Sequence, residues 1–221
     1  MTRTTLLLCG IVSVLLYFVM NVLGVALYPG YDWVSQTVSE LSAIGAPTRT
    51  MWVWLALAYT LLVLAFGFGV RRSAGRSASL RIVGTLLIIQ AVVGLGWPPM
   101  HQREVLARGG GTLTDTLHIA WAMVTSLLFL LAIAVGAAGF GTRFRVYSIA
   151  TLIVLLGAGA MTAFDGPKVG KNLPTPWIGV WERINIGAYL AWVVVLAVSL
   201  LRVRNPTRSE EGARTRAVNA R

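Results

Sequence analysis

Six long apolar runs dominate the sequence, and each is long enough to cross a lipid bilayer. They cover residues 5–28, 51–70, 80–97, 113–140, 146–164 and 181–203. A hydrocarbon layer of about 30 Å needs about 20 such residues in an α-helix, which satisfies its own backbone hydrogen bonds in lipid. The runs lack the period-two alternation of membrane barrel strands. We therefore predict an all-α fold, an integral membrane six-helix bundle over residues 1–204.

The basic residues indicate how this bundle is oriented. Most of the 19 Lys and Arg residues fall in the N-terminus, the second and fourth connections and the tail. Basic residues near span ends are retained in the cytoplasm, so both termini are expected there, in a multi-pass protein of the inner (plasma) membrane. The preference for Arg over Lys is typical of a GC-rich bacterial genome. The formal net charge of +11 does not indicate nucleic-acid binding, because the basic residues lie between apolar runs.

Two segments outside the spans have features of their own. In the first outer connection, apolar residues recur at helical spacing over residues 33–44, Asp32 is placed to cap a helix, and Gly45 provides a stop. We expect a short interfacial helix there. The tail at residues 205–221 has no apolar period and is expected to be disordered.

The ionisable side chains other than Arg gather on the predicted outer side. Six of the 8 acidic residues and both histidines lie there. They are Asp32, Glu40, His101, Glu104, Asp115, His118, Asp165 and Glu182. We therefore expect any binding or catalytic site to lie at the outer leaflet.

Short motifs along the chain carry a family resemblance. They are Tyr31-Asp32, Ser39-Glu40-Leu41-Ser42-Ala43, Trp97-Pro98-Pro99-Met100-His101, Leu113 to His118, and Trp181-Glu182-Arg183. In this order they resemble a bacterial membrane-protein family catalogued as domain of unknown function nine-nine-eight. The resemblance covers roughly residues 5–203 and implies a six-span protein without a settled activity. Typical members carry Asp shortly after Pro following the third span, where this chain has His101.

One carboxylate and one imidazole share a face of the fourth span. Asp115 and His118 are three residues apart on a helix and could meet one ligand, metal or proton. With Glu40 they are the candidate catalytic residues of a hydrolase. In the alternative interpretation, Asp115 caps the helix and His118 donates to a backbone carbonyl.

Arg183, Glu182, His101 and Asp32 are the candidate ligand-binding residues. Glu182 and Arg183 are adjacent on a helix and point about 100° apart, so each needs a partner from another helix. The expected pairs are Arg183 with Asp115, and Glu182 with His118 or His101. Such pairs could equally fix the register of the bundle.

The sequence gives little support to metal or serine chemistry. No HExxH or paired-histidine spacing is present, and the single cysteine, Cys9, excludes a cysteine-based zinc site, so no metal and no cofactor is predicted. A serine nucleophile, Ser39 or Ser42, could act with a histidine. However, GxSxG is absent and no third member can be named.

Three functions that involve a ligand or substrate are considered. The first is a protein that binds a lipid or small polar molecule at the outer leaflet, with membrane lipids as its partners. The second is an intramembrane hydrolase of a lipid-like substrate. A transporter is disfavoured because the spans at 5–28, 51–70, 80–97 and 146–164 contain no charged side chain in their apolar centres that would mark a path across. No acid on the inner side complements the outer cluster either. A structural partner protein without a pocket is the remaining alternative.

The expected orientation can be tested by cysteine labelling in intact cells. In a Cys9→Ala background, Ser209→Cys in the tail should react with an impermeant maleimide only after the membrane is permeabilised. The control, Lys171→Cys in a predicted outer loop, should react in intact cells. Labelling of the tail position from outside would contradict the orientation.

Overall fold

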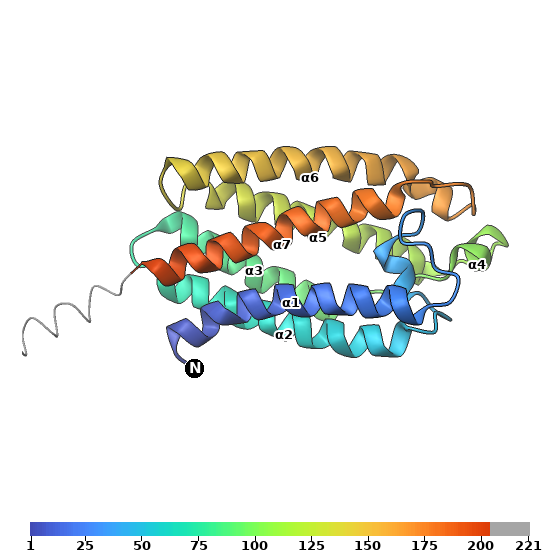
Figure 1. Cartoon of the computed structure of the whole chain (residues 1–221), viewed down its shortest axis with the longest axis horizontal. Coiled ribbons are helices and arrows are strands. Elements are labelled where there is room, and N and C mark those ends of the chain that lie inside the picture. Colours follow the sequence, from blue (N-terminus) through green and yellow to red (C-terminus); the bar gives the residue numbers. More distant parts are fainter. Residues whose placement is uncertain (204–221) are drawn as a thin grey trace, which may run out of the picture.

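Six long helices in the described part of the chain form a bundle and run along its length (Figure 1). A computed structural model describes residues 1–203, and the predicted disordered tail lies outside them. The long helices are α1 (Arg3–Leu27), α2 (Arg49–Ser73), α3 (Ala78–Leu95), α5 (Leu113–Gly136), α6 (Thr142–Val169) and α7 (Ile178–Arg202). All six are long and apolar enough to cross a membrane, which confirms the predicted all-α fold and number of spans.

Several helices extend beyond the apolar runs that predicted them. The second helix begins at Arg49 and ends at Ser73, and α6 continues to Val169. Polar and charged residues at these ends lower the local hydropathy, but the backbone hydrogen bonds continue through them. The fourth run instead stops early, at Gly136. The apolar runs therefore located the six helices but not the residues at which the helices begin and end.

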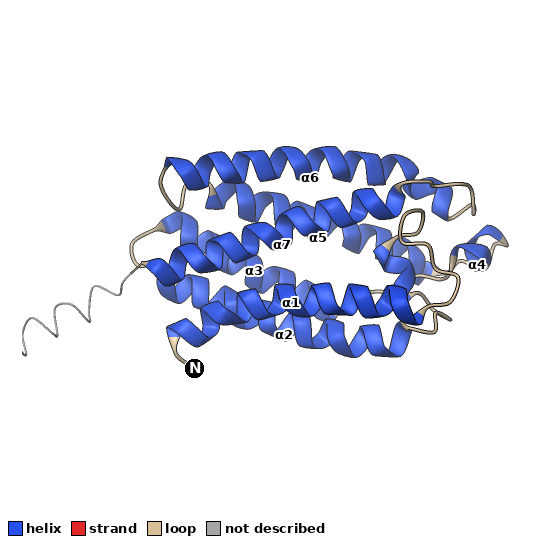
Figure 2. Ribbon diagram, viewed as in Figure 1, coloured by secondary structure: helices blue, strands red, loops and turns tan. Residues whose placement is uncertain are grey.

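The helices form a closed ring. Each long helix packs against the next along the chain, with α3 next to α5, and α7 closes the ring against α1. The N-terminus and the end of α7 lie at one end of the bundle (Figure 1). The opposite end, called the η1 end below, contains the short helices η1 (Val38–Ser42) and α4 (Arg103–Ala107). Figure 2 shows that the described residues form helices and loops without a strand.

The core is apolar but contains buried hydrogen bonds between helices. Tyr189 and Trp192 of α7 are 1% and 0% exposed. The Tyr189 hydroxyl donates to Gln90 Oε1 of α3 at 2.6 Å, and Trp192 Nε1 donates to Ser148 Oγ of α6 at 3.0 Å. Polar groups in a bilayer find no water, so these bonds tie α7 to its neighbours while satisfying their donors.

Small residues let α2 and α3 approach closely. A Cβ on Gly84 would lie 2.8 Å from the backbone nitrogen of Arg71 and 2.9 Å from the carbonyl oxygen of Gly67. Both atoms belong to the α2 backbone and cannot rotate away. Helix pairs in membranes often depend on such small residues, because van der Waals contact replaces the hydrophobic effect there.

Gly84→Ala is expected to destabilise the bundle despite the better helix propensity of Ala. The added methyl group must separate α2 from α3, at a cost of about 1–3 kcal/mol for overpacking. The control is Gly157→Ala in α6, where a Cβ would meet nothing within 4 Å; it should gain up to about 1 kcal/mol. Unfolding of the purified protein in detergent measures both. Equal effects of the two substitutions would contradict the close α2–α3 packing.

Candidate functional site

A buried loop covers the η1 end of the bundle. This loop, residues 28–48, is called the η1 loop here. It contains a short helix, as predicted, but that helix is a 3-10 turn over Val38–Ser42 and not an interfacial helix over 33–44. Four of its five residues are buried against the bundle, namely Val38, Glu40, Leu41 and Ser42. The loop therefore packs into the protein instead of lying along the lipid surface.

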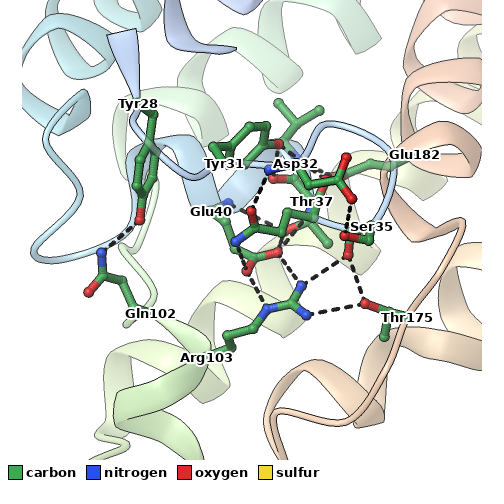
Figure 3. A network of polar contacts seen from close by, with 12 residues as sticks. Tyr28, Tyr31, Asp32, Ser35, Thr37, Glu40, Gln102, Arg103, Thr175 and Glu182 are labelled. Carbon is green, nitrogen blue, oxygen red and sulfur yellow. Dashed lines mark hydrogen bonds and ion pairs between the residues drawn. The ribbon is translucent and has the colours of Figure 1, made fainter. Parts of the chain in front are cut away.

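Glu40 forms a two-pronged ion pair with Arg103 (Figure 3). Arg103 Nε donates to Glu40 Oε1 at 2.6 Å and Arg103 Nη2 donates to Oε2 at 2.8 Å. The two residues are 3% and 8% exposed. Glu40 also accepts the Thr37 backbone N–H at 2.7 Å, which completes a capping box at the start of η1.

The same pair joins three segments that are far apart in the sequence. Arg103, in α4, also donates to Thr175 Oγ1 of the α6–α7 loop and to the Ser35 carbonyl (Figure 3). Burial disfavours the charged guanidinium, but the hydrogen bonds and charge of Glu40 outweigh it, so the pKa of Arg103 is raised. The pair holds the η1 loop, α4 and the α6–α7 loop together.

Glu182 and Arg183 both hold the η1 loop, through different atoms. Glu182 Oε2 accepts the Val38 backbone N–H at 2.6 Å, which satisfies an unpaired donor at the start of η1. Arg183 Nη1 donates to the Trp33 carbonyl at 2.9 Å, and Nη2 donates to the Tyr31 hydroxyl at 2.9 Å. The expected pairs with Asp115, His101 and His118 do not form, because the loop backbone supplies the partners.

The loop backbone reaches α7 because Gly179 has no side chain. Its N–H donates to the Val34 carbonyl at 3.0 Å. A Cβ on Gly179 would collide with the carbonyl oxygens of Gln36 and Trp33. This contact places the first loop beside the start of the last helix.

Asp115 and His101 pair with each other. Asp115 Oδ1 accepts the His101 backbone N–H at 2.7 Å, and Oδ2 accepts from His101 Nδ1 at 2.9 Å. Asp115 Oδ2 also accepts the Thr112 N–H at 2.7 Å within a capping box, so the predicted capping role is confirmed. A catalytic role for Asp115 or Glu40 stays a prediction, and the hydrogen bonds of both carboxylates are used within the fold.

His118 lies between a backbone carbonyl and a serine. Its Nδ1 is 2.7 Å from the Pro98 carbonyl oxygen and its Nε2 is 3.1 Å from Ser39 Oγ. The carbonyl can only accept, so Nδ1 carries the hydrogen, which confirms the expected bond to a backbone carbonyl. Asp115 and His118 thus share a helix face but have separate partners.

Asp32 lies in an exposed turn at the edge of the polar network (Figure 3). It accepts the Ser35 hydroxyl at 2.6 Å and the Val34 N–H at 3.0 Å. These two bonds lower the pKa of Asp32. Asp32 therefore caps the turn before η1 and does not cap a longer helix. The described residues contain no group of three or more metal-ligating side chains.

A groove of about 740 Å³ runs between α1 and α7, below the η1 loop. Its walls are mostly apolar and include Phe18 and Val22 of α1 and Leu190 of α7. Arg183 and Asn21 also line it. Asn21 Oδ1 is buried without a hydrogen-bond partner among the described residues. The groove thus has a long apolar wall, and Arg183 and Asn21 lie toward its η1 end.

The family described as "Protein of unknown function (DUF998)" matches residues 11–199. The chain belongs to this family. No curated protein and no solved structure matches it.

The motifs by which this DUF998 protein resembles its family meet at the η1 end. Ser39 and Glu40 lie in η1, His101 follows α3, His118 lies near the start of α5, and Arg183 lies near the start of α7. All five belong to the network that fixes the η1 loop, directly or through Ile44, whose N–H donates to the Met100 carbonyl at 2.7 Å. Arg103 and Asn21 were not singled out from the sequence. A buried Glu40 would require a cation, and that requirement was the only signal for Arg103.

Glu40→Gln is expected to destabilise the DUF998 bundle by about 3–5 kcal/mol, because it leaves Arg103 buried without a counter-charge. The matched control is Asp32→Asn, which keeps an acceptor for Val34 in an exposed turn and should cost less than about 1 kcal/mol. Denaturant unfolding in detergent, followed by tryptophan fluorescence, compares the two variants. A Glu40→Gln protein as stable as the control would contradict the role given to the ion pair.

Proposed function

We propose that this protein binds an anionic membrane lipid in the α1–α7 groove, with the head group at the η1 end and an acyl chain along the apolar wall. The observation that carries the proposal is the cationic Arg183 side chain at the head of a groove that is otherwise almost entirely apolar. Small-molecule sites typically combine apolar walls with a few placed polar groups. The groove volume suits one acyl chain and part of a head group.

The charge of Arg183 favours an anion. Its hydrogen bonds go to carbonyl oxygens and to the Tyr31 hydroxyl, which are uncharged. Burial raises the pKa of Tyr31, so that partner stays neutral. None of the ion pairs in the described part of the chain involves Arg183. A phosphate oxygen beside the guanidinium would supply a directly bonded anionic partner.

Asn21 favours a ligand that also donates a hydrogen bond. Its Nδ2 donates weakly to the Tyr17 carbonyl at 3.5 Å, whereas its Oδ1 has no partner among the described residues. A buried amide oxygen left unpaired costs about 1–3 kcal/mol, so a hydroxyl offered there would be favourable. Phosphate and hydroxyl occur together in the head group of phosphatidylglycerol.

Depth in the membrane supports the same assignment. Arg183 lies five residues from the start of α7 at Ile178, and Asn21 lies six residues from the end of α1 at Leu27. Both are therefore about 8–9 Å along the helix from the η1 end, near the border of the hydrocarbon layer. With the orientation expected from the Arg distribution, this border belongs to the outer leaflet of the plasma membrane.

Native mass spectrometry of the purified protein, titrated with phosphatidylglycerol or phosphatidylcholine, tests the proposal. We expect one phosphatidylglycerol to bind preferentially, and Arg183→Gln to weaken its binding about 10- to 100-fold, as expected for loss of a charged hydrogen bond.

A groove-filling variant separates lipid binding from loop anchoring. Gly187 lines the groove and a Cβ there would meet nothing within 4 Å, so Gly187→Phe should fill the groove and abolish binding without unfolding the protein. Gly157→Phe, at an equally open position on α6 outside the groove, is the matched control. Equal lipid binding by both phenylalanine variants would overturn the proposal.

A further inference from the structure

The geometry points to Ser39 and His118 as a nucleophile and base pair that cleaves a carboxylic ester of a lipid at the η1 end of the bundle. Ser39 Oγ lies 3.1 Å from His118 Nε2, within reach of proton transfer. These two residues do not line the α1–α7 groove. The inference is therefore independent of the lipid-binding proposal.

The hydrogen-bond chain fixes the imidazole in the form that a base requires. The Pro98 carbonyl can only accept, so His118 carries its hydrogen on Nδ1. In the neutral imidazole Nε2 then presents a lone pair, and the Ser39 hydroxyl donates to it. The Pro98 carbonyl orients the ring and would stabilise the imidazolium formed during catalysis, a task performed by a carboxylate in Ser-His-Asp triads.

Ser39 differs from the rest of η1 in its exposure and its partners. The other four residues of this short helix are buried, whereas Ser39 is half-buried. Its hydroxyl has no hydrogen-bond partner besides His118 among the described residues. His118 itself is 6% exposed and lies against the rings of Trp97 and Trp121, with centroids 6.4 and 6.0 Å away. The base is thus buried beside two indole rings, whereas the serine is partly exposed.

The position of the pair selects the class of substrate. His118 lies five residues beyond Leu113, where α5 begins, and α5 has 24 residues. A helix of this length is about 36 Å long, so a centred α5 places the pair within about 5 Å of the hydrocarbon edge. The ester carbonyls of glycerolipids lie at this depth, whereas soluble esters do not concentrate there.

The reaction balances without a cofactor. Ser39 Oγ adds to the ester carbonyl carbon while its proton moves to His118 Nε2. The bond to the alcohol oxygen then breaks, and His118 returns the proton to the departing alcohol, which leaves an acyl group on Ser39. Water adds to the acyl carbonyl with His118 again accepting the proton, and release of the fatty acid restores the Ser39 hydroxyl.

A fluorophosphonate probe, which forms a covalent phosphonate ester with activated serines as fluoride leaves, tests the assignment in the full-length protein in nanodiscs. Mass spectrometry of the labelled wild-type protein should locate the adduct on Ser39. Ser39→Ala should lose it, and Ser42→Ala, whose buried hydroxyl donates to the Ser39 carbonyl at 2.9 Å, should keep it. His118→Ala should slow labelling at least about 100-fold.

Release of fatty acid from phosphatidylglycerol nanodiscs provides a second readout. The wild-type protein and Ser42→Ala should release fatty acid, Ser39→Ala should not, and His118→Ala should do so much more slowly. His118→Gln, which can still donate to the Pro98 carbonyl, replaces His118→Ala if the latter does not fold. A folded wild-type protein that is unlabelled, or labelled only at another residue, overturns the assignment. This test does not depend on whether the variants fold, because the adduct is located in the wild-type protein. Equal labelling rates with and without His118 also overturn it.

Discussion

The requirement that every polar group near the bilayer find a partner within the protein controls the η1 end. The η1 loop carries backbone donors, carbonyls and a carboxylate into a region with little water, and each would be costly if left unpaired. The Glu40–Arg103 ion pair satisfies the most costly of these groups, the buried carboxylate. It neutralises the buried carboxylate with two short hydrogen bonds and brings α4 and the α6–α7 loop onto the same loop. Val38 and Ser39 belong to the same short helix as Glu40, so the pair helps to fix them.

The last helix connects this end to the core. Near its start, Gly179, Glu182 and Arg183 bind the backbone of the η1 loop. Further along, Tyr189 and Trp192 are buried between the other helices. Because α7 also forms one wall of the groove, a ligand there would contact the helix that anchors the loop. Lipid binding and loop position are thus physically coupled in the proposed function.

The sequence predicted which residues gather at the polar end more reliably than it predicted which partners they bind. Periodicity and hydropathy predicted six helices, and the clustering of acids and histidines predicted the polar end. The partners were mispredicted for Arg183 and Glu182, because these side chains bind backbone carbonyls and an N–H that every sequence contains. Ser39 was set aside for want of a third member, since a carbonyl such as that of Pro98 leaves no side-chain signature.

The sequence by itself determined the six spans, the helical fold and the end at which ionisable groups collect, because lipid imposes strong limits on the length and polarity of each segment. Only the tertiary structure decided that Asp115 joins His101, that Glu40 joins Arg103, and that His118 meets Ser39. These contacts join residues up to 79 positions apart. Their selection depends on the relative rotation and depth of packed helices, which no local pattern of residues specifies.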